Sequence, residues 1–166
     1  MSRIRAALDG IVFARTYTLS LLDTVPPADW FRMPAGAVSH VGWQVGHLAS
    51  AQYRLCLLRT RGARPEDVDF LPADFIKTFG ATSGIEPDPA AYPTSAAIRE
   101  VFDGVHRRVL AEVPTFAAAA LDAPLETPHR ICRTKFDCLP WCGRHELVHA
   151  GQIGLLRRHL GQKPVW

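Results

Sequence analysis

The chain has 166 residues, of which 48% are hydrophobic and 21% are charged, and its formal net charge is +3. This length and composition predict one globular domain over residues 1–166, long enough to bury a core without disulfides. The small net charge argues against a nucleic-acid-binding protein, and no segment approaches the roughly 20 apolar residues of a membrane-spanning helix.

The first predicted helix covers residues 3–24, where apolar side chains recur at helical spacing until Pro26 and Pro27 end it. Its charged residues, among them Asp9 and Arg15, make it a poor signal peptide. We therefore expect a cytoplasmic protein. Its four cysteines are then expected to be thiols rather than a disulfide framework.

The second predicted helix begins after Ser39, the expected N-cap, and runs to about Thr60. Gly62 stands where a helix C-terminus is expected. The inner face of this helix is marked by residues at helical spacing: Val41, Val45, Leu48, Gln52 and Leu55. The spacing therefore predicts a second amphipathic helix.

Two further helices are predicted, over residues 94–113 and 141–161. Proline-containing connections, residues 63–93 and 114–140, precede them, and the first is expected to hold a short helical turn around residues 73–79. Four amphipathic helices in one small domain predict an all-α four-helix bundle with two long connections. These connections leave room for crossovers, so a simple up-and-down order does not follow.

Charge is distributed unevenly along the chain. Residues 66–126 contain 11 acidic and 4 basic residues, whereas residues 129–166 contain 7 basic and 2 acidic residues. We expect the two segments to pack together and neutralise each other. The basic segment could in addition attract an anionic substrate.

The segment HELVH, residues 145–149, carries the most specific chemistry. On a helix, His145 and His149 lie one turn apart on the same face, where both could bind one metal ion. The segment fits the H-E-x-x-H pattern of zinc proteases, but no acidic residue follows Glu146. The glycine and the histidine of the extended metzincin motif are also missing. A protease is therefore not expected.

A third ligand would have to come from another part of the chain, and His47 is the best candidate. It lies in the middle of the second helix among apolar neighbours, where a buried imidazole needs a metal ion or a hydrogen bond. Metal sites in bundles are built from side chains on facing helices. The other histidines are expected near a helix N-terminus (His40), on a solvated helix face (His106), in a proline-rich loop (His129) and in a last helical turn (His159).

A local zinc site is an open alternative. Cys142 precedes His145 by about one turn, and Cys138 lies four residues earlier, so two thiolates and two imidazoles could bind one ion. Such a site would leave His47 without a role. These cysteines, and Cys132 before them, could equally be ordinary buried thiols.

Two segments resemble the DinB-like superfamily. One is VGWQVGHLASAQYRL in the second helix. The other is HELVHAGQIGLLRRHLGQKPVW, which is similar to that family's closing H-x-x-x-H-A-G-Q-I-x-x-L-R-R signature and its Pro-aromatic end. The letters FG and YPT in the connection 63–93 are also similar to family members. The resemblance spans most of the chain, and the C-terminal motif is its more specific part.

The resemblance implies a four-helix bundle that binds one divalent metal ion, usually zinc or nickel, through three histidines. Position by position, these are His47, His145 and His149. Glu146 would then be a helix residue whose fit to the protease pattern is coincidental. Family members often form homodimers, and characterised relatives include thiol-dependent S-transferases and a thiol-dependent maleylpyruvate isomerase. The early name of the family, linked to DNA damage, does not imply DNA binding.

Three neutral imidazoles leave a coordination position open for water or a thiol. Together with the family resemblance, this site leads us to expect a thiol-dependent S-transferase-like enzyme that combines a small-molecule substrate with a low-molecular-weight thiol. A metal-dependent hydrolase and a non-catalytic metal-binding bundle are the alternatives. Gln44 and Gln152, each about one turn from a ligand, could orient ligands or water. Arg144 and Arg157 could contact an anionic thiol or a substrate carboxylate.

Overall fold

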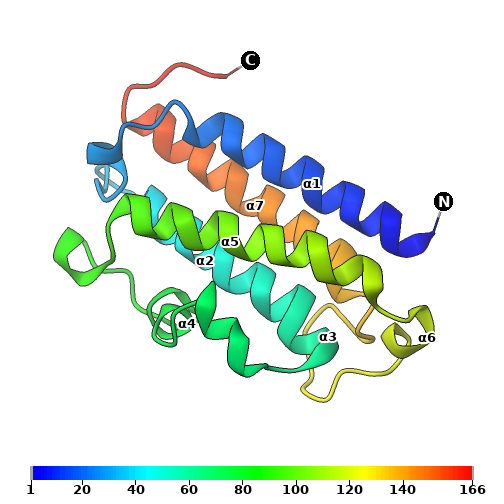
Figure 1. The fold of residues 1–166 in the computed structure, drawn as a ribbon. Coiled ribbons are helices and arrows are strands. Elements are labelled where there is room, and N and C mark those ends of the chain that lie inside the picture. The colour runs from blue at the N-terminus through cyan, green and yellow to red at the C-terminus, as the bar shows by residue number, and fades with distance from the viewer. Residues whose placement is uncertain (1, 166) are drawn as a thin grey trace.

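The structure is a computed structural model that describes residues 2–165, so Trp166 of the Pro-aromatic end lies outside the described residues. Within this range the protein is all-α and contains no β-strand, as predicted (Figure 1). The bundle consists of α1 (Arg3–Leu22), α2 (Val41–Tyr53) with its continuation, α5 (Ser95–Glu112) and α7 (Cys138–His159). None of the described helices is both long and apolar enough to cross a membrane.

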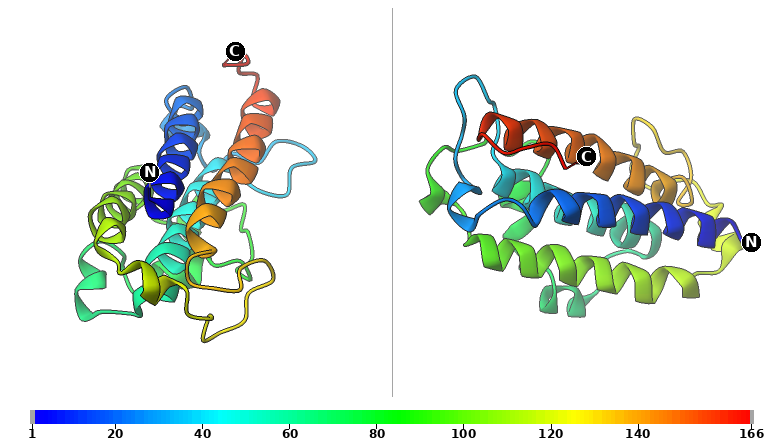
Figure 2. Two further views of the ribbon diagram at one scale, coloured as in Figure 1. Left: turned by 90° about the vertical axis from the view of Figure 1, so that its right-hand side faces the viewer. Right: turned by 90° about the horizontal axis from the view of Figure 1, so that it is seen from above.

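The bundle contains one crossover. Helices α1 and α7 pack side by side and run in the same direction, whereas α2 and α5 pack together and run in the opposite direction (Figures 1 and 2). The connection between α2 and α5 must therefore return along the bundle. It contains two 3-10 helices, η3 (Pro65–Asp69) and η4 (Pro89–Ala91), with α4 (Phe75–Phe79) between them, which confirms the expected helical turn.

The other connections join neighbouring helix ends. The segment between α1 and α2 contains the short 3-10 helix η1 (Pro27–Asp29). The segment between α5 and α7 contains η5 (Val113–Thr115) and α6 (Ala118–Leu121). Each of these two connections lies at one end of the bundle, so neither of them runs along its length (Figure 2).

The N-cap of α2 is His40, and the prediction of Ser39 was wrong. The backbone N–H of Trp43 donates a hydrogen bond of 3.1 Å to Nδ1 of His40. A neutral imidazole nitrogen accepts such a bond as a serine oxygen would. The hydroxyl of Ser39 is instead engaged by the side-chain amide of Gln44.

Helix α7 begins at Cys138, three residues earlier than predicted. Pro140 is tolerated in the first turn because the N–H groups there have no acceptor within the helix. Helix α2 continues through a π-helical turn, η2 (Arg54–Leu58), into the short α3 (Arg59–Arg61). Gly62 then ends the segment with a φ of 85°, as predicted. The hydrophobic pattern had given no sign of the π turn.

The core lies between the four long helices and includes every residue predicted for the inner face of α2. Helices α1 and α7 approach closely at Gly143, where an added Cβ would lie 2.9 Å from the carbonyl oxygen of Gly10. A backbone atom cannot move aside as a flexible side chain can. The small residue therefore allows the close contact that holds α7 against α1.

A buried polar network crosses this core. The guanidinium of Arg15 on α1 donates to Glu146 on α7 (2.8 Å), to Gln52 on α2 (2.8 Å) and to the carbonyl oxygen of Phe102 on α5 (2.8 Å). Arg15 and Glu146 are only 3% and 1% exposed. Glu146 thus has a structural partner that the sequence did not predict, and its side chain is bonded within the core.

His106 on α5 belongs to the same network, so the prediction of a solvated face was wrong. The side-chain amide of Gln52 donates to Nδ1 of His106 over 3.1 Å, and the imidazole is half-buried. Burial, and then the charge of Arg15, lower the pKa of His106 to about 3. The imidazole therefore stays neutral in the folded protein at neutral pH.

The free energy of unfolding is expected to fall as the pH drops below about 6.5, the ordinary pKa of histidine in the unfolded chain. Below that pH the unfolded chain binds a proton at His106 that the folded protein does not bind until about pH 3. At pH 5, unfolding should take up about one proton more in the wild type than in a His106→Gln variant. Urea titrations between pH 4.5 and 8 measure this difference.

The matched control is His159→Gln, because His159 is exposed in the last turn of α7. This variant should keep the pH dependence of the wild type. If the free energy of unfolding of His106→Gln depended on pH as steeply as that of the wild type, protonation of His106 would not be the cause of the pH dependence.

Candidate metal centre

Three histidines from two helices meet in the interior of the bundle. They are His47 on α2 and His145 and His149 on α7, and one ring nitrogen of each lies within 4.8 Å of the others. The Nε2 atoms of His145 and His149 are 3.2 Å apart. Among residues 2–165 this is the one group of three or more His, Cys, Asp or Glu side chains that could hold a metal ion.

Hydrogen bonds at the opposite ring nitrogens orient two of these imidazoles. Nδ1 of His47 lies 3.0 Å from the carbonyl oxygen of Phe79, and Nδ1 of His149 lies 2.6 Å from Oε1 of Gln44. Each oxygen accepts a hydrogen bond, so each Nδ1 carries the proton and each Nε2 keeps a free lone pair. The lone pairs therefore belong to the atoms that a metal ion would contact.

Gln44 is itself held in place. It is buried, and its amide nitrogen donates to the hydroxyl of Ser39 over 2.9 Å, which fixes the carbonyl end toward His149. Gln44 thus occupies the orienting position that its place in the sequence predicted. Gln152 is exposed and lines a cavity beside His149, and no hydrogen bond joins these two side chains in the described part of the chain.

Aromatic rings restrict the same imidazoles. The indole of Trp43 stacks on His47 with ring centroids 4.9 Å apart and an interplanar angle of 8°. Trp141 meets His145 edge-on at 6.0 Å. Because packed rings cannot rotate freely, the geometry of the cluster is set before any ion binds.

Burial keeps the three imidazoles neutral. It is the largest cause of a lowered pKa at each of them, and it brings the pKa of His145 to about 4 and that of His149 to about 3. The neighbouring histidines contribute to both of these lowered pKa values, because two positive charges so close together repel each other. Neutral imidazole is the form that binds a metal ion, so no proton has to leave at pH 7.

The alternative zinc site with two cysteines is wrong. Cys138 and Cys142 are buried free thiols that do not join His145 and His149 in a group able to hold a metal. Cys142 instead contacts Cys56, and Cys138 contacts Cys132. Burial raises the pKa of the Cys138 thiol to about 12, so it is protonated at neutral pH.

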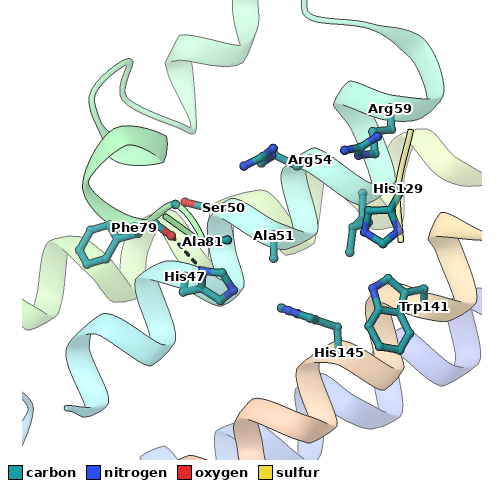
Figure 3. Close-up of a pocket in the computed structure, with 12 residues that line it drawn as sticks. His47, Ser50, Ala51, Arg54, Arg59, Phe79, Ala81, His129, Trp141 and His145 are labelled. Carbon is teal, nitrogen blue, oxygen red and sulfur yellow. Dashed lines mark hydrogen bonds between the residues drawn. The ribbon is translucent and has the colours of Figure 1, made fainter. Parts of the chain in front are cut away.

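Two cavities adjoin the cluster. The first has a volume of about 220 Å³, and His47 and His145 form part of its wall (Figure 3). The second has about 510 Å³ and is lined by His149 and by apolar residues that include Trp43, Ile85 and Leu155. Small molecules in either cavity would thus lie against a histidine of the cluster.

The first cavity is cationic, and its arginines are not the predicted ones. Arg54 and Arg59 line it together with His129. Arg144 is exposed and does not line it, and Arg157 is buried elsewhere, where its Nε donates to the hydroxyl of Thr24. The basic C-terminal segment therefore contributes His129 to this wall, but the guanidinium groups come from α2 and its continuation.

A family model of the DinB superfamily matches residues 11–153, which include all three histidines. The chain belongs to the DinB superfamily. A search of curated proteins found no match to the chain. Family membership and the three-histidine cluster together fit a metal-binding protein.

Replacing Gln44 by alanine should weaken metal binding by about 10- to 100-fold, because the hydrogen bond that orients His149 is lost. Competition with a chromophoric chelator measures the affinity for zinc. Gln152→Ala is the matched control and should bind zinc as the wild type does, since Gln152 is exposed. Unchanged affinity in Gln44→Ala would mean that this bond does not support the site.

Proposed function

We propose that this protein is a metal-dependent, thiol-dependent S-transferase-like enzyme of the DinB superfamily. A divalent ion, zinc or nickel, would be held by His47, His145 and His149, and a low-molecular-weight thiol would be joined to a small electrophile. The observation that carries the proposal is the position of three neutral imidazoles beside a cavity lined by two of them. The family resemblance further supports a homodimer, and we propose a cytoplasmic location.

An ion bound there by three neutral ligands would keep its full charge and an open position, and would lower the pKa of a coordinated thiol. The protein's own residues determine which thiol can reach that position. His47 and His145 face the first cavity, so a molecule in it has direct access to the cluster. Trp141 lines the same cavity and narrows it next to His145.

The lining favours a thiol over an activated water. Among the described residues that line the first cavity there is no Asp or Glu to act as a general base. Nδ1 of His129 accepts hydrogen bonds from the backbone N–H groups of Ile131 (3.2 Å) and Cys132 (3.0 Å). The neutral ring therefore carries its proton on Nε2 and acts as a donor, not as a base. A coordinated thiol needs no such base.

The second cavity is the proposed binding site of the electrophile. Its walls are mainly apolar, and His149 connects it to the cluster. A transferase needs two substrates at one centre. One cavity lined by His47 and His145 and another lined by His149 meet that need. We expect the thiol in the first cavity and an apolar electrophile in the second.

The proposal is tested with zinc- and nickel-loaded protein, assayed with bacillithiol, mycothiol and glutathione against a panel of fluorogenic electrophiles. Conjugation that disappears in the metal-free protein and in a His145→Ala variant would support it. Hydrolysis of ester or amide substrates without any thiol would identify the hydrolase instead. Stoichiometric metal binding with neither activity would identify a non-catalytic metal-binding bundle.

A further inference from the structure

We propose that Arg54, Arg59 and His129 form a binding subsite for an oxyanion, a carboxylate or a phosphate, of the molecule that occupies the first cavity. The inference rests on the proposed function in taking the three-histidine cluster as the reacting end. It adds the chemical class of the substrate, a thiol with a negatively charged group at a distance from its sulfur. Figure 3 shows the two arginines on one helix and His145 and Trp141 on the helix across the cavity.

The π turn brings the two guanidinium groups to the same cavity. In a regular α-helix, side chains five residues apart point about 140° away from each other. Between Arg54 and Arg59 the helix is π-helical, and the N–H of Arg59 donates to the carbonyl oxygen of Arg54. This five-residue bond closes a wider turn, so the two side chains lie on the same side. A π-helical turn is less favourable than a regular α-helical turn and is frequent at functional sites. A binding role for Arg54 and Arg59 would explain why it occurs here.

Among the described residues that line the first cavity, no carboxylate balances the positive charge of the two arginines. Within the described residues, Arg54 makes no hydrogen bond or ion pair, and Arg59 makes one bond, from Nη1 to the carbonyl oxygen of Thr127 (2.8 Å). Other arginines of the bundle, such as Arg15 and Arg61, pair with carboxylates. Half-buried guanidinium groups without a carboxylate partner favour a bound anion.

The neighbouring surface does not supply that anion. Glu126 lines an adjacent cavity that also contacts Arg54 and Arg59, but it lies 3.8 Å from Lys135 and its side chain is 91% exposed. A solvated carboxylate that lines only the adjacent cavity leaves the charge in the first cavity uncompensated.

Two further hydrogen-bond donors line the same cavity, the hydroxyl of Ser50 and Nε2–H of His129. The hydroxyl of Ser50 belongs to a side chain that is 1% exposed and lines the cavity, yet it has no hydrogen-bond partner in the described part of the chain. His129 keeps its Nε2 proton because two backbone N–H groups occupy Nδ1. Buried polar groups normally have a partner, and a bound oxyanion could accept from both.

The test uses cobalt-loaded protein, in which a bound thiolate gives a sulfur-to-cobalt charge-transfer band. Mercaptoalkanoates and mercaptoalkyl phosphates with two to five methylene groups are compared with mercaptoalcohols of the same length. At least one anionic series should bind about tenfold or more tightly than the alcohols, and the better series identifies the anion. The Arg54→Met/Arg59→Met variant should lose this preference and still bind the alcohols. Arg144→Met, an exposed control, should keep it.

Equal binding of anionic and neutral thiols by the wild type, or a preference that persists in the double variant, would overturn the proposal. Absence of the cobalt spectrum before any thiol is added would instead overturn the metal centre. In that case the subsite is read in metal-free protein by NMR titration with phosphate and acetate. Shifts of the Arg54, Arg59 and His129 signals support it, and unperturbed signals reject it.

Discussion

Replacing His47 by alanine is expected to lower the affinity for zinc or nickel by at least about 100-fold. Residues that only orient a metal ligand already contribute 10- to 100-fold, so the loss of a ligand itself should be larger. The remaining pair, His145 and His149, lies on one helix and cannot enclose an ion alone. Metal analysis of protein purified without an affinity tag, combined with chelator competition, measures the effect.

His159→Ala is the control, because it removes an exposed imidazole from the same protein. His145→Ala and His149→Ala should match His47→Ala, since all three nitrogens meet at one point. Circular dichroism should show that the helices are retained, because the three imidazoles are neutral and their loss leaves no buried charge behind. Full stoichiometric zinc in His47→Ala would contradict a three-histidine centre.

The histidines of the centre could be predicted from the sequence because their chemistry shows in the side chains themselves. The spacing of His145 and His149 places both on one helical face, and His47 is conspicuous among apolar neighbours. The groups that orient them could not be predicted in the same way. The acceptor for His47 is the backbone carbonyl of Phe79, and every residue has such a group.

The residues Arg54, Arg59 and His129 of the first cavity could not be predicted from the sequence, for a geometric reason. The periodicity of a regular helix separates Arg54 from Arg59, and only the π turn brings them together. His129 reaches the cavity from an irregular segment, whose path depends on tertiary packing. The two arginines predicted to contact an anionic substrate, Arg144 and Arg157, do not line this cavity.

The helices were predicted well because amphipathic spacing extends over many residues. Their ends depend on single interactions, which is why His40 rather than Ser39 caps α2 and why α7 starts before Pro140. The crossover was left open by the sequence, since long connections permit several orders. Packing of α1 on α7 and of α2 on α5 decides the order.

Replacing Glu146 by alanine is expected to destabilise the protein by about 3–5 kcal/mol, because it leaves the charge of Arg15 unpaired in the core. The remaining acceptors, Gln52 and the carbonyl oxygen of Phe102, are neutral. Urea unfolding in the presence of a chelator measures this change without a contribution from bound metal. The double variant Arg15→Met/Glu146→Leu should regain most of the loss, since no buried charge remains.

A further variant, Glu146→Gln, separates two explanations of the HELVH segment. If Glu146 were the general base of a protease, Glu146→Gln would abolish peptide hydrolysis and leave the free energy of unfolding nearly unchanged. Its ion pair with Arg15 predicts the opposite, a clear loss of stability and no protease activity to lose. Zinc affinity should fall by less than in His47→Ala, because Glu146 fixes the rotation of α7 but contacts no ion. The glutamate between the two histidines thus positions the helix that presents them.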